Sequence, residues 1–283
     1  MSATTEPHIL IRLWGIIPIS VLHFFGYILG SLLFILSFLF TNKRKKIFAV
    51  IRKCGFENPN YILFKYLQVL SCAILDYPFW WLNHDSRIKR HIFLDDRQGI
   101  LTKYQNKPVI FIGGHLSSTE VIGRLVGCYR QPVTFLYQGS KNQSLQKFHN
   151  IRSTLSKFIP ISSKQTSALR QIIRNLKKNG SVIIYPDMPS PKESSVKINF
   201  FNYPSWMMIL PMKLKELSES DTKVVYFETI HSFAKYSIIL SDITEQLANN
   251  NITENIQKVN DIIEVSIKKH PEQYLWFSNK FRK

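Results

Sequence analysis

The sequence predicts an α/β fold, in which a mainly parallel sheet is flanked by helices and preceded by an N-terminal membrane-anchoring helix. After residue 101, short apolar runs that end in turn residues alternate with longer helical stretches, which is typical of a parallel sheet with helical crossovers. Before it, the run from Leu13 to Phe40 contains no Asp, Glu, Lys or Arg. Such a run is long enough to cross a hydrocarbon core of about 30 Å as a helix.

The apolar run ends at Phe40, and a basic cluster from Lys43 to Lys46 follows it. A cleaved signal peptide has a shorter apolar core that ends at small residues. A buried core helix rarely lacks a polar face. We therefore expect an uncleaved anchor, and Pro18 with two glycines leaves open whether it spans the bilayer or lies in one leaflet.

The basic residues predict an orientation and a partner. The chain of 283 residues has a formal net charge of +18, which attracts anionic lipid surfaces or nucleic acid. The basic cluster lies directly against the apolar segment, which favours lipid over nucleic acid. Basic residues concentrate on the C-terminal flank of the anchor, so we expect everything after residue 40 to be cytoplasmic.

We divide the chain into an N-terminal anchor with its basic flank, residues 1–42, and a cytoplasmic α/β domain, residues 43–283. Residues 43–100 are predicted to be helical and close to the membrane. The aromatic group from Tyr77 to Trp81 fits a protein core or a membrane interface equally well. The three cysteines, Cys54, Cys72 and Cys128, are far apart and lack His partners at metal spacing, so reduced thiols and no metal site are expected.

Six short apolar runs are predicted strands. They are 108–112, 133–137, 158–162, 182–185, 224–227 and 236–240. The intervening stretches are predicted helices. They are 121–128, 144–156, 166–178 and 206–217, with a last amphipathic helix at 254–269.

A histidine and a glutamate lie where the first strand after residue 101 ends. His115 follows the strand and the Gly113-Gly114 turn, at the end of a strand where α/β folds place functional groups. Ser117 is able to cap the next helix, so Glu120 falls in its first turn. An imidazole that a carboxylate orients is a general base, able to take a proton from an alcohol attacking an acyl carbonyl. The alternative is a capping box, in which Glu120 merely bonds the backbone at the helix start.

The surroundings of this pair resemble one family along nearly the whole chain, the bacterial lipid A late acyltransferases of the lauroyl and myristoyl type. They share an anchor with a basic flank and the strand that leads into His115. Three later segments agree in order: Tyr137 with Asn142, Tyr185-Pro186-Asp187 before Phe200-Phe201, and the tail His270-Pro-Glu-Gln-Tyr-Leu-Trp276.

The resemblance implies an O-acyltransferase of lipopolysaccharide biosynthesis at the cytoplasmic face of the bacterial inner membrane. His115 would be the base and Glu120 its orienting carboxylate, with a fatty acyl thioester as donor and a glycolipid hydroxyl as acceptor. Acyl carrier protein or coenzyme A would carry the acyl group, and no cofactor is needed. Asp187 would position substrate, and turn propensity alone explains it equally well as a turn residue between the strand and Pro189.

Asn142 and Lys280, at positions of the family pattern, are further candidates for substrate binding. Other basic candidates for binding a head group are Arg124, Arg152, Lys141 and Lys164, and each of these four is also explained as an ordinary solvated surface charge. The chain departs from the family pattern at Leu116-Ser-Ser-Thr119, Gln138, Asn202 and Ser278-Asn279. An acceptor other than a lipid A precursor, such as a lysophospholipid or another glycolipid, therefore stays open. A non-catalytic basic membrane protein is the alternative from a different class. A nucleic-acid fold signature, a nucleophile elbow and a phosphate-binding loop are all missing from the sequence.

Overall fold

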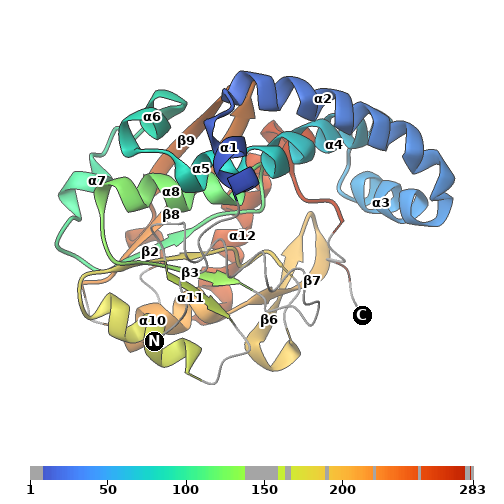
Figure 1. Cartoon of the computed structure of the whole chain (residues 1–283). Coiled ribbons are helices and arrows are strands. Elements are labelled where there is room, and N and C mark those ends of the chain that lie inside the picture. Colours follow the sequence, from blue (N-terminus) through green and yellow to red (C-terminus); the bar gives the residue numbers. More distant parts are fainter. Residues whose placement is uncertain are drawn as a thin grey trace.

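The computed structural model describes residues 9–137, 159–162, 167–188, 191–218, 221–247, 250–277 and 281. Its helices, drawn in Figure 1, are α1 (Ile9–Ile16), α2 (Ile19–Leu36), α3 (Thr41–Lys53), α4 (Pro59–Leu75), α5 (Tyr77–Leu82), α6 (Asp85–Arg90), α7 (Ile100–Lys103), α8 (Thr119–Tyr129), α10 (Ala168–Leu176), α11 (Leu210–Leu217) and α12 (Ile252–Lys269). Its strands are β1 (Ile92–Asp95), β2 (Val109–Ile112), β3 (Val133–Tyr137), β4 (Ile159–Ser162), β5 (Ser181–Ile184), β6 (Ser195–Phe200), β7 (Tyr203–Met208), β8 (Lys223–Ser232) and β9 (Lys235–Asp242).

Seven strands form one sheet in the order β1-β9-β8-β2-β5-β3-β4. All neighbours in it are parallel except β8 and β9, which form an antiparallel pair. The mainly parallel α/β fold predicted from the sequence is confirmed, and all six predicted strands are present. The predicted helix at 144–156 lies outside the described residues.

The sheet divides the apolar core into two layers, because successive strand residues point to opposite faces. Ile110 and Ile112 of β2 face a core that includes α4, α10 and α12. Val109 and Phe111 face the other core, which includes α5, α7 and α8. The aromatic group of α5 belongs to this second core, since Phe79, Trp80 and Trp81 are at most 5% exposed. A protein core is therefore the correct interpretation of that group.

The helical region before the sheet contains two long apolar helices. Segments 19–39 and 59–82 are both long and apolar enough to cross a membrane, and α2 lies along α4 in Figure 1. Asn58 caps α4 by accepting a hydrogen bond from the Tyr61 backbone, and Pro59 occupies its first turn, where a missing N–H costs nothing. Most of residues 43–100, which the sequence predicted to be helical, lie in helices α3 to α7, but residues 92–95 form β1.

One predicted helix, 206–217, is wrong in its first part. Residues 203–208 form β7, which pairs along its whole length with β6, and only Leu210–Leu217 is helical. The hairpin turn consists of Phe201 and Asn202, both in the left-handed region with φ of 48° and 63°. A turn with two left-handed residues normally contains glycine or asparagine at both positions. Because Phe201 is neither, the residue types did not indicate a turn here. Strand β1 was also missed, because its four residues carry little periodicity.

Candidate active site

The loop that carries His115 starts from β2, in the interior of the sheet. Gly113 and Gly114 let this loop pass close to packed side chains. A Cβ on Gly113 would come within 2.5 Å of the Phe227 ring, and one on Gly114 within 2.9 Å of Ile263. Only glycine fits such close approaches. The path of the chain into His115 therefore depends on both glycines.

Asp187 holds His115 by both of its carboxylate oxygens. Oδ1 lies 2.6 Å from Nδ1 of the ring, and Oδ2 accepts the backbone N–H of His115 at 3.0 Å. The contact follows from strand register. Ile112 at the end of β2 is opposite Ile184 at the end of β5, and His115 and Asp187 each lie three positions after the end of their own strand. The Asp187 side chain is 3% exposed and that of His115 is 18% exposed.

This arrangement fixes the chemistry of the imidazole. An ionised carboxylate only accepts, so Nδ1 carries the proton and Nε2 carries the lone pair. The ring of Tyr185 packs against the imidazole with centroids 4.5 Å apart and limits its rotation. A partly exposed histidine with a buried carboxylate behind it is the geometry of a general base.

Glu120 lies in the first turn of α8 and is 2% exposed. Its Oε2 accepts a hydrogen bond of 2.8 Å from the indole N–H of Trp81 in α5. The sequence suggested Glu120 as the carboxylate that orients His115. In the structure the carboxylate bound to the His115 ring is Asp187, and the indole of Trp81 bonds Glu120.

The capping-box alternative for Glu120 is wrong. Helix α8 begins at Thr119, so Ser118 is its N-cap, and it makes no side-chain cap bond. Glu120 is then the second helical residue, whereas a capping box needs the third. Ser117 has a φ of 56° and donates its backbone N–H to Gln273 at 2.8 Å, outside the helix.

The C-terminal tail supports the His115 loop from the other side. The backbone N–H of Leu275 donates to the carbonyl of His115 at 3.0 Å, and Leu116 pairs with Tyr274 in an isolated bridge. Gln273 also bonds the backbone of His231 with both ends of its amide. The tail motif noted in the sequence is therefore part of the framework of the site, a role that sequence reasoning missed.

Arg124, a candidate for head-group binding, is 3% exposed, and its guanidinium is engaged within the protein. It donates to the carbonyls of Trp80 and Asn83 and to the carboxylate of Asp85. These bonds tie α8 to α5 and α6, so this placement argues against contact with substrate. Asn142, Arg152, Lys280, Lys141 and Lys164 lie outside the described residues, as do Gln138, Ser278 and Asn279.

Within the described part of the chain, one group of side chains comes close enough together to hold a metal ion: His23, Cys72 and His231. The ring of His23 already has protein partners at both nitrogens, Asp76 at Nε2 and the Ala234 N–H at Nδ1. These contacts favour a polar network over a metal centre.

Comparison with known proteins identifies the family of this chain. Residues 8–283 match the model of the family described as bacterial lipid A biosynthesis acyltransferase. The chain belongs to this family. It is 25% identical over 276 residues to the lipid A biosynthesis palmitoleoyltransferase of Escherichia coli (strain K12) and to the lipid A biosynthesis acyltransferase of Shigella flexneri, covering 95% of this chain and 88% of each relative. Membership makes the chain an O-acyltransferase, as the sequence predicted, which excludes the non-catalytic alternative.

Proposed function

We propose that this protein transfers a fatty acyl chain from an acyl thioester to a hydroxyl group of a lipid A precursor at the cytoplasmic face of the inner membrane. Both relatives are named for lipid A biosynthesis, which supports the acceptor class. The observation that carries the proposal is the imidazole of His115, partly exposed and held from behind by Asp187.

In the proposed reaction, Nε2 of His115 takes the proton of the acceptor hydroxyl as its oxygen attacks the thioester carbonyl. The tetrahedral intermediate then collapses, the carbon–sulfur bond breaks and the ester forms. The leaving thiolate takes the proton back from the imidazolium. Atoms and charges balance without a covalent acyl-enzyme and without a metal or organic cofactor.

The two buried carboxylates have different proposed roles. Asp187 fixes the tautomer and orientation of the ring, as its two bonds to His115 suggest. Glu120 forms the catalytic pair with His115, adding negative charge in the same loop-to-helix segment and favouring the imidazolium in the transition state. The donor is an acyl thioester of acyl carrier protein or coenzyme A. The candidates outside the described residues, Asn142, Arg152 and Lys280, stay predictions for substrate binding.

The decisive test compares His115→Ala with His84→Ala, a control at an exposed histidine at the start of α6. Purified variants receive a labelled acyl chain as the thioester of acyl carrier protein or of coenzyme A, together with a lipid A precursor. We expect His115→Ala to lose about 10²- to 10⁴-fold in turnover, because general-base catalysis is removed. Wild-type turnover in that variant would refute the proposed base.

The acceptor is tested in cells. Lipid mass spectrometry of strains with and without the gene should show lipid A differing by the mass of one acyl chain. The same difference on a lysophospholipid, with lipid A unchanged, would replace the proposed acceptor by the alternative one.

A further inference from the structure

Helix α2 has two faces of opposite character. One face is buried against the protein and consists of Ile19, Leu22, His23, Gly26 and Gly30. The other face is 38–63% exposed and entirely apolar. Its residues are Val21, Phe24, Phe25, Ile28, Leu29, Leu32, Leu33, Ile35 and Leu36. An exposed apolar surface of this extent marks a binding surface.

The buried face of α2 packs closely against α4. A Cβ on Gly26 would lie 2.6 Å from the sulfur of Cys72, and one on Gly30 would lie 2.4 Å from the Cα of Gln68. Two glycines one turn apart thus allow the two helix backbones to approach each other. Gln68 also donates its side-chain N–H to Ser31 at 3.0 Å.

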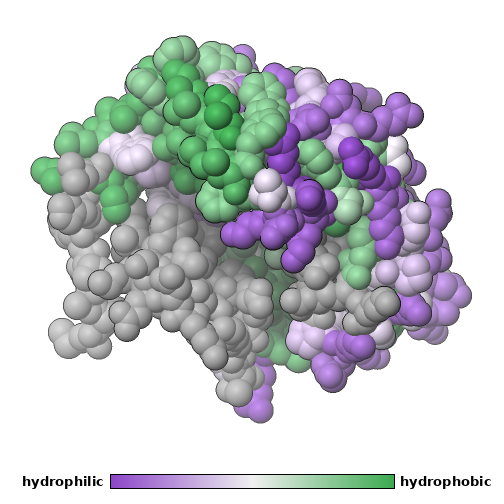
Figure 2. Space-filling view, turned by 90° about the vertical axis from the view of Figure 1, so that its right-hand side faces the viewer, coloured by the Kyte–Doolittle hydropathy of each residue, from purple (hydrophilic) through white to green (hydrophobic). Residues whose placement is uncertain are grey.

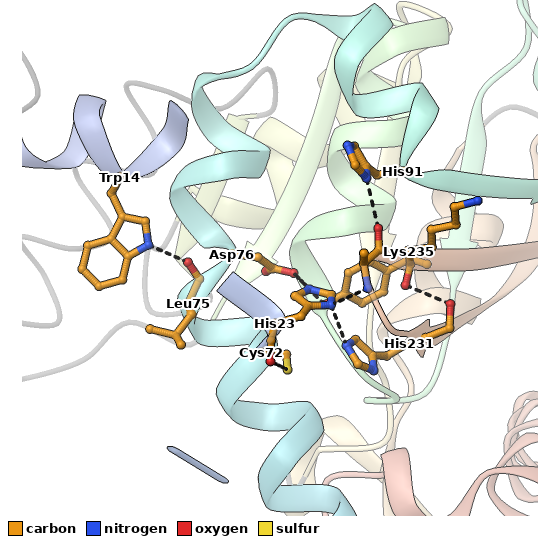
Figure 3. A network of polar contacts seen from close by, with 11 residues as sticks. Trp14, His23, Cys72, Leu75, Asp76, His91, His231 and Lys235 are labelled. Atoms are coloured by element: carbon orange, nitrogen blue, oxygen red, sulfur yellow. Dashed lines mark hydrogen bonds and ion pairs between the residues drawn. The ribbon is translucent and has the colours of Figure 1, made fainter. Parts of the chain in front are cut away.

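His23 fixes the same helix to the central sheet, as Figure 3 shows. Its Nε2 lies 3.1 Å from Oδ2 of Asp76, and its Nδ1 accepts the backbone N–H of Ala234 at 3.0 Å. Nε2 of His231 lies 3.2 Å from the same Nδ1, and both His23 and Asp76 are fully buried. Separating α2 from the domain would remove His23 as the partner of Asp76, His231 and the Ala234 N–H, at a high cost in free energy.

These contacts are incompatible with a helix that crosses the bilayer alone. His23 touches the β8–β9 hairpin, so a spanning α2 would carry strand ends of the central sheet to bilayer depth. Irregular or edge backbone exposed to lipid leaves unsatisfied N–H and C=O groups, which the hydrocarbon region does not tolerate. Helix α2 and the sheet therefore lie on the same side of the membrane.

A basic segment borders the apolar face. Helix α3 follows α2 after the exposed Phe38, Leu39 and Phe40, and it exposes Lys43, Lys45 and Lys46. Figure 2 looks at the end of the molecule where α2 and α3 lie and shows a hydrophobic area next to a strongly hydrophilic one. An apolar surface with a basic border matches a membrane that contains anionic lipid.

We propose that α2 is an in-plane anchor. The membrane face, defined as the exposed apolar residues of α2 together with Ile9, Leu13 and Ile16 of α1 and Phe38–Phe40, sinks into one leaflet of an anionic phospholipid bilayer. Helix α2 stays docked on the catalytic domain, which fixes the height of that domain above the lipid. The inference concerns membrane topology and binding, so it stands or falls independently of acyl transfer.

Sidedness tests the proposal. Arg12→Cys and Glu57→Cys place one exposed thiol before α2 and one after α3, both outside the membrane face, and the wild type with its buried Cys54 and Cys72 and half-buried Cys128 gives the background. A membrane-impermeant maleimide is applied to right-side-out and to inside-out membrane vesicles. We expect both engineered thiols to react in the same vesicle preparation. Reaction in opposite preparations would demonstrate a spanning helix and overturn the proposal.

Binding tests the face itself. The double variant Phe25→Asp with Leu32→Asp adds two charges to the membrane face, and Leu217→Asp, a half-exposed position on α11, is the control. Cosedimentation with phosphatidylglycerol–phosphatidylcholine vesicles should fall at least about tenfold for the double variant and remain unchanged for the control. Equal binding of all three proteins would refute the membrane face.

Discussion

At the scale of single residues, Asp187 is the side chain on which the state of His115 depends. It accepts the backbone N–H and the ring Nδ1–H of the same residue. In Asp187→Asn the amide oxygen must face the backbone N–H, which is always a donor. The amide NH₂ then faces the ring, which adapts by moving its proton to Nε2. We expect a fall in kcat of about 10²- to 10⁴-fold, since the base has lost its lone pair.

Steady-state kinetics with the purified variant, together with its melting temperature in detergent, provide the measurement. A merely structural role for Asp187 would lower the melting temperature and leave the kcat of the folded fraction unchanged. Glu120→Gln is the companion variant, because the amide oxygen keeps the bond from Trp81 while the charge is lost. If that variant kept full turnover, Glu120 would not belong to the catalytic pair.

His231 makes the stability of the fold depend on pH. Burial, with repulsion from His23, lowers the pKa of His231 to about 3. An unfolded histidine binds its proton near pH 6.5, so the unfolded state gains protons first as the pH falls. The free energy of unfolding should therefore drop by about 1.4 kcal/mol per pH unit from this group between pH 6.5 and 3.

His231→Gln removes this titration, and urea unfolding in detergent at a series of pH values measures it. As the pH falls, the free energy of unfolding of the variant should drop less steeply than that of the wild type, by the equivalent of about one bound proton. The exposed His84→Gln is the control and should keep the wild-type slope. Identical slopes in all three proteins would show that His231 does not set the acid sensitivity.

The residues at the site also show where sequence reasoning stops. His115 was predicted because the strand, the two glycines and the histidine are contiguous in the sequence. Its bond to Asp187 joins residues 72 positions apart, and only the pairing of β2 with β5 brings them together. Glu120 is nearer to His115 in the sequence, so the sequence-based interpretation assigned the orienting role to Glu120 instead of Asp187.

At the scale of elements, apolar runs bounded by turns predicted six of the seven strands of the main sheet, all except β1. The β6–β7 hairpin was missed because its turn contains Phe201 in a left-handed conformation that the residue type does not signal. The sequence also did not show which elements the N-terminal apolar helix packs against. Nothing in the run from Leu13 to Phe40 indicated that its glycines face α4 or that His23 faces the sheet.

Gly30→Val tests that helix pairing. The added Cβ would lie 2.4 Å from the Cα of Gln68, so α2 and α4 must move apart. We expect a loss of about 1–3 kcal/mol, as for other overpacked contacts, and a melting temperature lower by several degrees. Leu32→Val, on the exposed face of α2, is the matched control and should melt within a degree or two of the wild type. Equal melting of both variants would mean that α2 and α4 do not pack tightly in solution.

At the scale of the whole molecule, composition predicted a basic protein with a membrane segment, and it suggested a division at residue 42. In the structure, α2 lies before that boundary but is hydrogen-bonded to the domain that follows it, through Asp76, His231 and Ala234. A tethered anchor and an integral helix predict different behaviour when residues 1–40 are removed. If α2 is only a tether, its removal leaves a soluble domain of unchanged stability. If α2 is an integral part of the fold, its removal exposes part of the hydrophobic core to solvent.

We expect the truncated chain to aggregate or to melt well below the full-length protein, because Asp76 and the buried face of α4 lose their cover. A protease site inserted between Phe40 and Thr41 allows the covalent link to α2 to be cut while the helix itself remains in the sample. After cleavage in detergent, the fragment that contains α2 should co-elute with the rest of the protein on size exclusion, with the melting temperature retained. Release of the fragment, together with a truncated chain that melts like the wild type, would show that α2 is only a tether. Co-elution would mean that the contacts of His23 and the two glycines hold the helix in place without the covalent link.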